Sequence, residues 1–233
     1  QLKLMNPRED IKVVLMQNRR WDNAITNLKP AYIQDNVLDY NYDKENVFHG
    51  GNEFRYFDIR TTRLNGENVE KVTFIRPYYH ITLAQDEIRG NKKFMPYKEM
   101  NGNYTIESQD RVNDADTECD YMFVHFYLKM PAPLMGGTVN VFGALTGWTA
   151  NKSNEMKWDF NESAYHLSML LKQGYYNFQY IYVPDGAKQY DSVNLEGSFY
   201  LTENDYQIFA YYRDISSRYD RLVGYVSLNS TVK

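Results

Sequence analysis

The stretch that decides the fold is Gly174-Tyr175-Tyr176-Asn177-Phe178-Gln179-Tyr180-Ile181-Tyr182-Val183, a glycine-led run dense in aromatic and β-branched residues. Such side chains favour the pleated, half-buried surface of a β-strand. Pro184-Asp185-Gly186 follows the run, and this combination of residues is typical of a turn. The stretch therefore predicts a long β-strand that ends at a defined turn.

The same alternation of apolar and polar residues recurs along the whole chain, and helical periodicity is hard to find. Further strands are predicted over residues 10–17, 69–75, 121–128, 137–145, 163–171, 205–213 and 220–228. Asn65-Gly66 and Asn101-Gly102-Asn103 each predict a hairpin turn. Many short strands separated by turn signals are typical of β-sandwiches. We therefore expect an all-β protein with two immunoglobulin-like β-sandwich domains in tandem.

A polar stretch near the middle of the chain suggests where these two domains divide. Residues 109–120 contain the carboxylates Asp110, Asp114, Asp116, Glu118 and Asp120. Such a stretch reads as a solvated linker, and 233 residues suit two domains of ordinary size. The expected domains are residues 1–115 and residues 116–233.

Composition excludes several classes of function. The net charge is −4, so the chain has no basic excess with which to neutralise a nucleic acid backbone. Cys119 is the single cysteine, which excludes an intramolecular disulfide and a zinc site built on several cysteines. No apolar run reaches the roughly 20 residues of a membrane-spanning helix, so we expect no membrane insertion. Because residues 1–5 are no signal peptide and lack an initiator Met, a mature or trimmed chain is expected.

Catalytic motifs are also missing from the sequence. His49, His80, His125 and His166 are scattered without metal-ligand spacing. The chain has no P-loop, no Gly-x-Gly-x-x-Gly and no nucleophile elbow. We expect no enzyme, no metal, no cofactor and no small-molecule substrate. A hydrolase would need His125 or His166 to meet a nucleophile and a carboxylate in a pocket.

Part of the C-terminal half resembles the early-set immunoglobulin-like domains. The resemblance rests on Gly143-Ala144-Leu145-Thr146-Gly147-Trp148, on Tyr165-His166-Leu167-Ser168-Met169 and on residues 174–180. It is similar to starch- and glycogen-binding modules, which stack sugars on exposed tryptophans. Trp148 and Trp158 are therefore candidate carbohydrate-binding residues, and the alternative is that both pack between sheets or under a loop.

Three further motifs, in the same order, resemble the type IX secretion system plug protein family of Bacteroidetes. The first is Asn18-Arg19-Arg20-Trp21-Asp22-Asn23-Ala24, and the second covers residues 46–58. The third combines Tyr211-Tyr212-Arg213 with residues 218–224. Family members also carry an N-terminal domain after a signal peptide, so the resemblance covers their middle and C-terminal portions.

This resemblance implies a non-enzymatic protein of the periplasm, associated with the outer membrane. Its partner would be a giant outer-membrane translocon β-barrel whose periplasmic opening it closes. The candidate partner-binding residues are Trp21, Tyr211, Arg213, Arg218 and Tyr219.

Two of the motifs also have a structural interpretation. Glu53, Arg55 and Phe57 would share one strand face, with ion pairs and aromatic packing where the domains meet. Residues 218–221 would form a turn locked by Arg–carboxylate hydrogen bonds.

Overall fold

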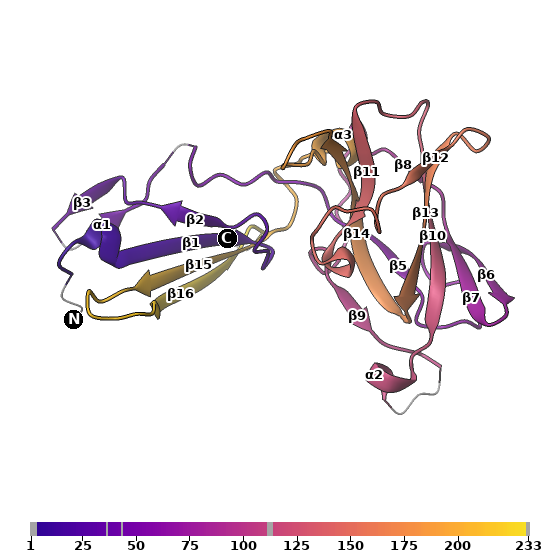
Figure 1. The fold of residues 1–233 in the computed structure, drawn as a ribbon, viewed down its shortest axis with the longest axis horizontal. Helices are drawn as coiled ribbons and strands as arrows, with labels where there is room; N and C mark the ends of the chain where they lie inside the picture. The colour runs from indigo at the N-terminus through magenta and orange to yellow at the C-terminus, as the bar shows by residue number, and fades with distance from the viewer. Residues whose placement is uncertain (1–3, 36, 43, 111–113, 232–233) are drawn as a thin grey trace. The chain divides into compact units, whose positions relative to one another are not determined.

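The chain folds into two compact units, which we describe separately. The computed structural model describes residues 4–35, 37–42, 44–110 and 114–231 (Figure 1). Unit 1 combines Gln1–Gly50 with Leu201–Lys233, and unit 2 spans Gly51–Tyr200. In the sequence, unit 2 therefore lies between the two segments that form unit 1.

The expected boundary near residue 115 is wrong, and so is the tandem order of the domains. Strand β10 (Tyr121–Lys129) pairs in parallel with β7 (Tyr78–Leu83), and β14 (Gly174–Pro184) pairs with β5 (Arg55–Asp58). Strands from both sides of residue 115 thus share sheets in unit 2. The polar stretch contains a short helix, α2 (Ala115–Glu118), in a connection within one sandwich. The exposed carboxylates Asp114, Glu118 and Asp120 therefore lie in a connection within unit 2 and do not mark a domain limit.

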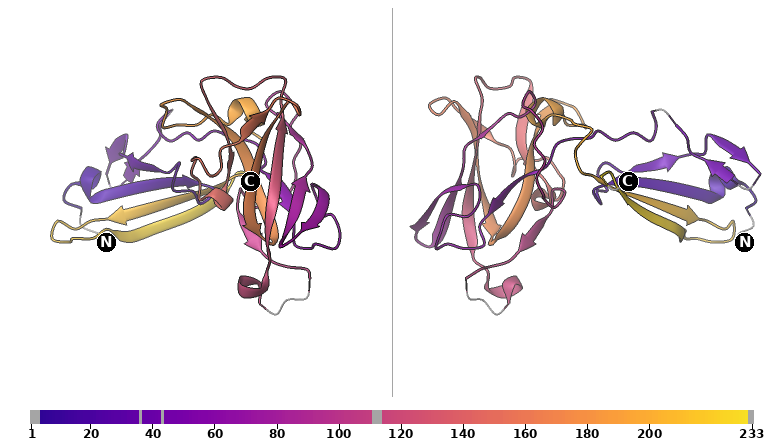
Figure 2. Two further views of the ribbon diagram at one scale, coloured as in Figure 1. Left: turned by 45° about the vertical axis from the view of Figure 1, so that its right-hand side comes forward. Right: turned by 180° about the vertical axis from the view of Figure 1, so that it is seen from behind.

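Unit 2 is a β-sandwich of two sheets (Figure 2). The larger sheet orders its strands as β12 (Lys157–Asp159), β13 (Ala164–Lys172), β10, β7 and β6 (Val69–Ile75), with β8 (Asp86–Glu87) beside β10. The smaller sheet orders β11 (Gly137–Phe142), β14 and β5, with β9 (Tyr104–Ile106) also on β14. A 3-10 turn, η1 (Ala144–Thr146), and a short helix, α3 (Val193–Glu196), complete the unit.

The core of unit 2 lies between these sheets and follows from the alternation along each strand. In β10 every second side chain is buried, namely Met122, Val124, Phe126 and Leu128. Phe57 of β5 packs against Phe126 from across the core and against Phe178 of the neighbouring strand β14. The expectation of an all-β sandwich fold is confirmed.

Unit 1 is organised by pairing between the two ends of the chain. Its sheet has the order β16 (Arg221–Asn229), β15 (Asp205–Tyr212), β1 (Ile11–Gln17) and β2 (Ile25–Leu28). The β1–β15 register runs without interruption from Ile11 opposite Tyr212 to Gln17 opposite Tyr206. A short helix, α1 (Pro7–Asp10), precedes β1, and β3 (Tyr32–Gln34) and β4 (Val37–Asp39) form a separate hairpin.

The hairpin predicted at Asn65-Gly66 is also wrong. The strand before this turn, β5, belongs to the smaller sheet of unit 2, and the strand after it, β6, belongs to the larger one. The turn therefore connects the smaller sheet of unit 2 to the larger one. Within the described residues, no helix is long and apolar enough to cross a membrane.

Candidate functional site

The turn after β1 presents Trp21, one of the candidate contact residues. Asn18 adopts a left-handed conformation with φ of 57°. Its amide donates to Asn204 Oδ1 at 2.8 Å, and its Oδ1 accepts from the Asp205 N–H at 2.9 Å. These bonds fix the turn to the start of β15.

The buried side chain of Arg20 also stabilises this turn. It makes a bidentate pair with Asp22, with Nε–Oδ1 at 3.1 Å and Nη2–Oδ2 at 2.6 Å. Trp21, between these two residues, is 63% exposed. The first motif therefore builds an anchored turn that leaves an indole at the surface.

Trp21 belongs to a group of rings on one face of the unit 1 sheet, which we call the aromatic row. It consists of Trp21, Phe209, Tyr211 and Tyr225. Phe209 lies at its centre: its ring centroid is 6.4 Å from Trp21, 6.4 Å from Tyr211 and 5.1 Å from Tyr225. The cross-strand register places Phe209 opposite Tyr225 on β16, so the pairing of distant segments assembles the row.

Charged side chains lie next to the aromatic row, at the end of the sheet where β15 stops and β16 begins. Asp220 pairs with Arg213 and with Lys12 of β1. Hydrogen bonds from Arg213 and Lys12 lower the pKa of Asp220. Asp220, the carboxylate of the expected lock, does accept a hydrogen bond from an arginine, but that arginine is Arg213, which lies outside residues 218–221. Arg218 and Tyr219 are exposed in the adjoining turn.

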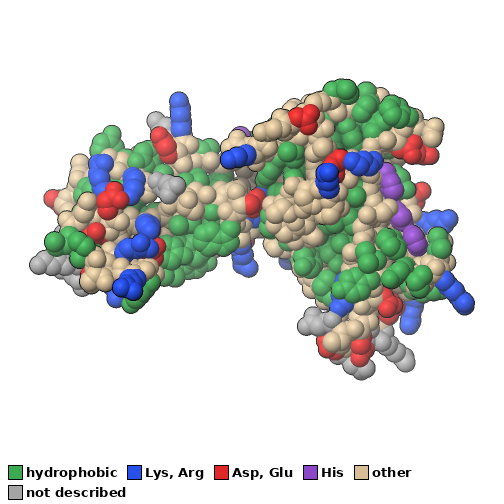
Figure 3. All heavy atoms as spheres, in the orientation of Figure 1, with side chains coloured by type: hydrophobic (Ala, Val, Ile, Leu, Met, Phe, Trp, Pro, Cys, Tyr) green, Lys and Arg blue, Asp and Glu red, His purple; other side chains and the backbone are tan. Residues whose placement is uncertain are grey.

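The opposite face of the same sheet holds an apolar groove of about 750 Å³. It is lined by side chains of the sheet and by Tyr40, Asn46, Val47 and Phe48, and the ring of Phe48 lies 5.9 Å from that of Tyr206. Val13, Leu15, Leu28, Ile208 and Leu228 form its floor. Figure 3 shows hydrophobic side chains gathered over β15 and β16. Unit 1 therefore exposes apolar surface on both faces of its sheet.

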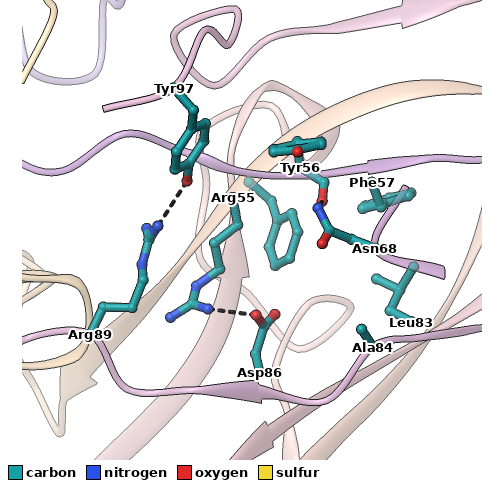
Figure 4. A pocket seen from close by; sticks show the side chains of 10 residues that line it. Arg55, Tyr56, Phe57, Asn68, Leu83, Ala84, Asp86, Arg89 and Tyr97 are labelled. Atoms are coloured by element: carbon teal, nitrogen blue, oxygen red, sulfur yellow. Dashed lines mark hydrogen bonds and ion pairs between the residues drawn. The ribbon is translucent and has the colours of Figure 1, made fainter. Parts of the chain in front are cut away.

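A second candidate, in unit 2, is a buried charged cluster beside a cavity of about 270 Å³ (Figure 4). Arg55 Nε donates to Glu196 Oε1 at 2.9 Å, and Arg55 Nη1 donates to Asp86 Oδ1 at 2.5 Å. Arg89 donates to the other oxygen of Glu196, Oε2, at 2.8 Å. Tyr180 donates its hydroxyl proton to Asp86 Oδ2 at 2.9 Å.

The electrostatics of this cluster indicate mutual neutralisation. Burial alone would lower the pKa of Arg55, but Glu196 and Asp86 outweigh it and raise that pKa. Burial raises the pKa of Asp86, and Arg55 offsets only part of the effect. Burial also acts upward on Glu196, but Arg55 and Arg89 outweigh it, so the pKa of Glu196 is lowered.

Both oxygens of Asp86 accept hydrogen bonds from side chains of the same unit. The expected ion pairs of Arg55 are present, and all their partners belong to unit 2. The cluster therefore acts as a structural tie within the sandwich.

The tryptophans proposed for carbohydrate binding belong to different layers of unit 2. Trp148 is half-buried, with its ring 5.9 Å from Phe54 in an edge-on contact, and it covers Gly102. Trp158 on β12 is half-buried against Tyr165, at 5.1 Å. Both indoles make T-shaped contacts with unit 2 rings, and the structure does not bring them together on one sugar-binding platform.

Three histidines meet on the outer face of the larger sheet, where Figure 3 shows histidine side chains in a line. His80 Nδ1 lies 3.0 Å from His125 Nε2, and His125 Nδ1 lies 2.7 Å from Ser168 Oγ. Ser168 Oγ is also 3.3 Å from His166 Nε2. Burial, then His166 and His80, lower the pKa of His125.

The serine and histidines do not complete a hydrolase site of the expected kind. Their described hydrogen bonds include no carboxylate, and neither cavity described above includes them. Among the residues that the structure describes, no group of three or more His, Cys, Asp or Glu side chains is placed to hold a metal ion.

Fold and surface together define an all-β protein in which the sheet of unit 1 leaves apolar side chains accessible on both of its faces. No protein-family model matches the chain, and no curated protein matches it. The chain is similar to a hypothetical protein from Parabacteroides merdae of known crystal structure, with 36% identity and a TM-score of 0.89. The match covers 97% of this chain and 56% of that one, so this chain spans little more than half of that protein's length.

Proposed function

We propose that this chain acts by binding another protein, without catalysis, as the plug subunit of a type IX secretion translocon. It would cover the periplasmic opening of the outer-membrane barrel sterically and dissociate when cargo passes. The observation that supports this proposal best is the aromatic row. Trp21 and Tyr211 come from separate motifs of the family resemblance, and they both contact Phe209.

The chemistry of this surface suits a reversible protein contact. Aromatic residues and arginine are enriched at the centres of interfaces, where they contribute most of the binding energy. Here Arg213 and the exposed Arg218 lie beyond the aromatic row, and Tyr219 adds a further exposed ring. The buried cluster around Arg55, by contrast, has its charges paired internally. These features favour binding over catalysis.

The proposal is tested by affinity capture from native outer membranes with a C-terminally tagged chain. We expect recovery of one very large outer-membrane β-barrel protein. Trp21→Ser removes a ring that is 63% exposed, and should reduce recovery by at least tenfold. Tyr200→Ser is the matched control, because Tyr200 is 91% exposed and lies in unit 2.

Two results would contradict the proposal. One is equal recovery by the Trp21→Ser variant and the Tyr200→Ser control. The other is no barrel at all, together with glucan binding that Trp148→Ala and Trp158→Ala abolish. The second result would establish a carbohydrate-binding module instead.

A further inference from the structure

Strand β16 is a sheet edge with apolar side chains on both of its faces. It ends the order β16-β15-β1-β2, and within the described chain only β15 pairs with it. Its apolar side chains are 40–59% exposed, namely Leu222, Val223, Tyr225, Val226 and Leu228. The one charged residue of β16, Arg221, stands at its first position. A long apolar edge without a central charge or proline is a template for pairing with another strand.

Three other sheet edges, at β2, β6 and β12, are protected in the usual ways. Strand β2 has only four residues. Strand β6 carries Glu70 and Lys71, and β12 carries Lys157 and Asp159. Short length and charged side chains both discourage pairing between sheet edges. The nine residues of β16 have neither kind of protection.

The surroundings of β16 restrict what can pair with it. The groove lies on one side of the sheet and the aromatic row on the other, and both are apolar. A strand that continues the sheet must therefore carry apolar side chains on both of its own faces. Strand β16 is itself such a strand, with Val226 and Leu228 on the groove side and Tyr225 on the side of the aromatic row.

We propose that β16 pairs with β16 of a second copy, antiparallel and about a two-fold axis perpendicular to the sheet. Such an interface uses the same surface patch from both copies. It would join two four-stranded sheets into one continuous sheet and satisfy the outward-facing backbone groups of β16. Both aromatic rows would then lie on the same side of the joined sheet.

The regular part of β16 fits this arrangement. Its pairing with β15 is free of irregularity from Gly224 to Asn229. An axis at Val226 sets each Val226 opposite its counterpart, Gly224 opposite Leu228, and Tyr225 opposite Ser227. No charged side chain is opposed by a like charge in this register, so no repulsion works against pairing.

The test is the molar mass in solution, measured by light scattering during size exclusion from low micromolar to near-millimolar concentration. We expect the wild type to reach twice its 27.6 kDa. Val226→Lys places two lysines opposite each other at the axis and should yield a monomer. Val37→Lys is the matched control, because Val37 is 63% exposed on β4, away from β16, and this variant should remain a dimer.

Amide hydrogen exchange of the wild type gives a second measurement that needs no variant. The amides of residues 224–229 should exchange more slowly as concentration rises, and those of β4 should not change. A monomer at every concentration, or a Val226→Lys variant that is still a dimer, would overturn the proposal. The result is separable from the plug test, because Trp21→Ser leaves β16 intact.

Discussion

The two units use similar strands in opposite ways. In unit 2 the apolar faces of two sheets meet, and Phe57, Phe126 and Tyr180 are completely buried. In unit 1 a single four-stranded sheet carries apolar side chains on both faces, and Tyr225 remains 59% exposed. Unit 2 therefore encloses a core between its sheets, whereas the sheet of unit 1 leaves apolar side chains accessible on both faces. Mutations should therefore affect stability in unit 2 and association in unit 1.

The largest expected effect is the loss of a core ring from unit 2. Phe57→Ala removes contacts with Phe126, Tyr176 and Phe178, and should lower the free energy of unfolding by about 4 kcal/mol. Urea unfolding followed by fluorescence measures it. A Trp21→Phe background confines the signal to Trp148 and Trp158, which both lie in unit 2. A loss below about 1 kcal/mol would mean that this core is not well packed.

The next effect concerns the buried charges. Glu196→Gln keeps the shape of the side chain but leaves Arg55 and Arg89 with less negative charge to balance them. Removing one partner of a buried ion pair typically costs about 3 kcal/mol or more. Unfolding in the same Trp21→Phe background measures the loss. Glu155→Gln, in a pair whose partner Lys157 is 76% exposed, is the control and should cost less than about 1 kcal/mol.

These contrasts show how far the sequence could predict the fold. Alternation and composition identified β10, β14 and β16 because each of these strands has a local signal. The insertion of unit 2 into unit 1 has no such signal, since it depends on β1 pairing with β15 across nearly the whole chain. Asn65-Gly66 is a genuine turn signal, but a turn does not specify whether its flanking strands share a sheet.

The candidate site was predictable to a similar extent. Trp21 and Tyr211 were identified as possible contacts, whereas Phe209 and Tyr225 were not, because only the strand register brings them together. Glu196 had no sequence signal of any kind. Its role as the partner of Arg55 arises because α3 packs beside β14. Arg55 and Glu196 are far apart in the sequence, so only folding brings them together and no local sequence pattern marks their contact.

A third prediction concerns pH. Burial, with a further contribution from Glu53, raises the pKa of Glu99 to about 8, from an ordinary value of 4.5. Between these values the folded state holds a proton that the unfolded state releases, so stability should fall as pH rises from about 5 to 8. One proton limits the slope to about 1.4 kcal/mol per pH unit.

Glu99→Gln should remove this slope, and urea unfolding at several pH values measures it. The lowered pKa of Glu196 has the opposite sign, since its stabilisation is lost as pH falls below the unfolded value of 4.5. Between pH 5 and 8 the raised pKa of Asp86 and the lowered pKa of His125 also contribute to the slope, so the difference between the wild type and Glu99→Gln isolates Glu99. An unchanged slope in the Glu99→Gln variant would show that another group titrates.

The smallest expected change in stability is in unit 1, where it separates the two units most clearly. Tyr225→Ser removes a ring that is 59% exposed, so unfolding of unit 1 should change by no more than about 1 kcal/mol. A Trp148→Phe, Trp158→Phe background leaves Trp21 as the reporter of that unfolding. Tyr176→Ser in unit 2, at a side chain only 2% exposed, should cost several times more, measured in the Trp21→Phe background where Trp148 and Trp158 report on unit 2. Because the ring of Tyr225 is exposed and that of Tyr176 is buried, Tyr225→Ser should reduce the binding of an apolar dye by the folded chain, whereas Tyr176→Ser should not. Equal costs for the two substitutions would mean that the aromatic row is a core of unit 1 and not a surface open to a partner.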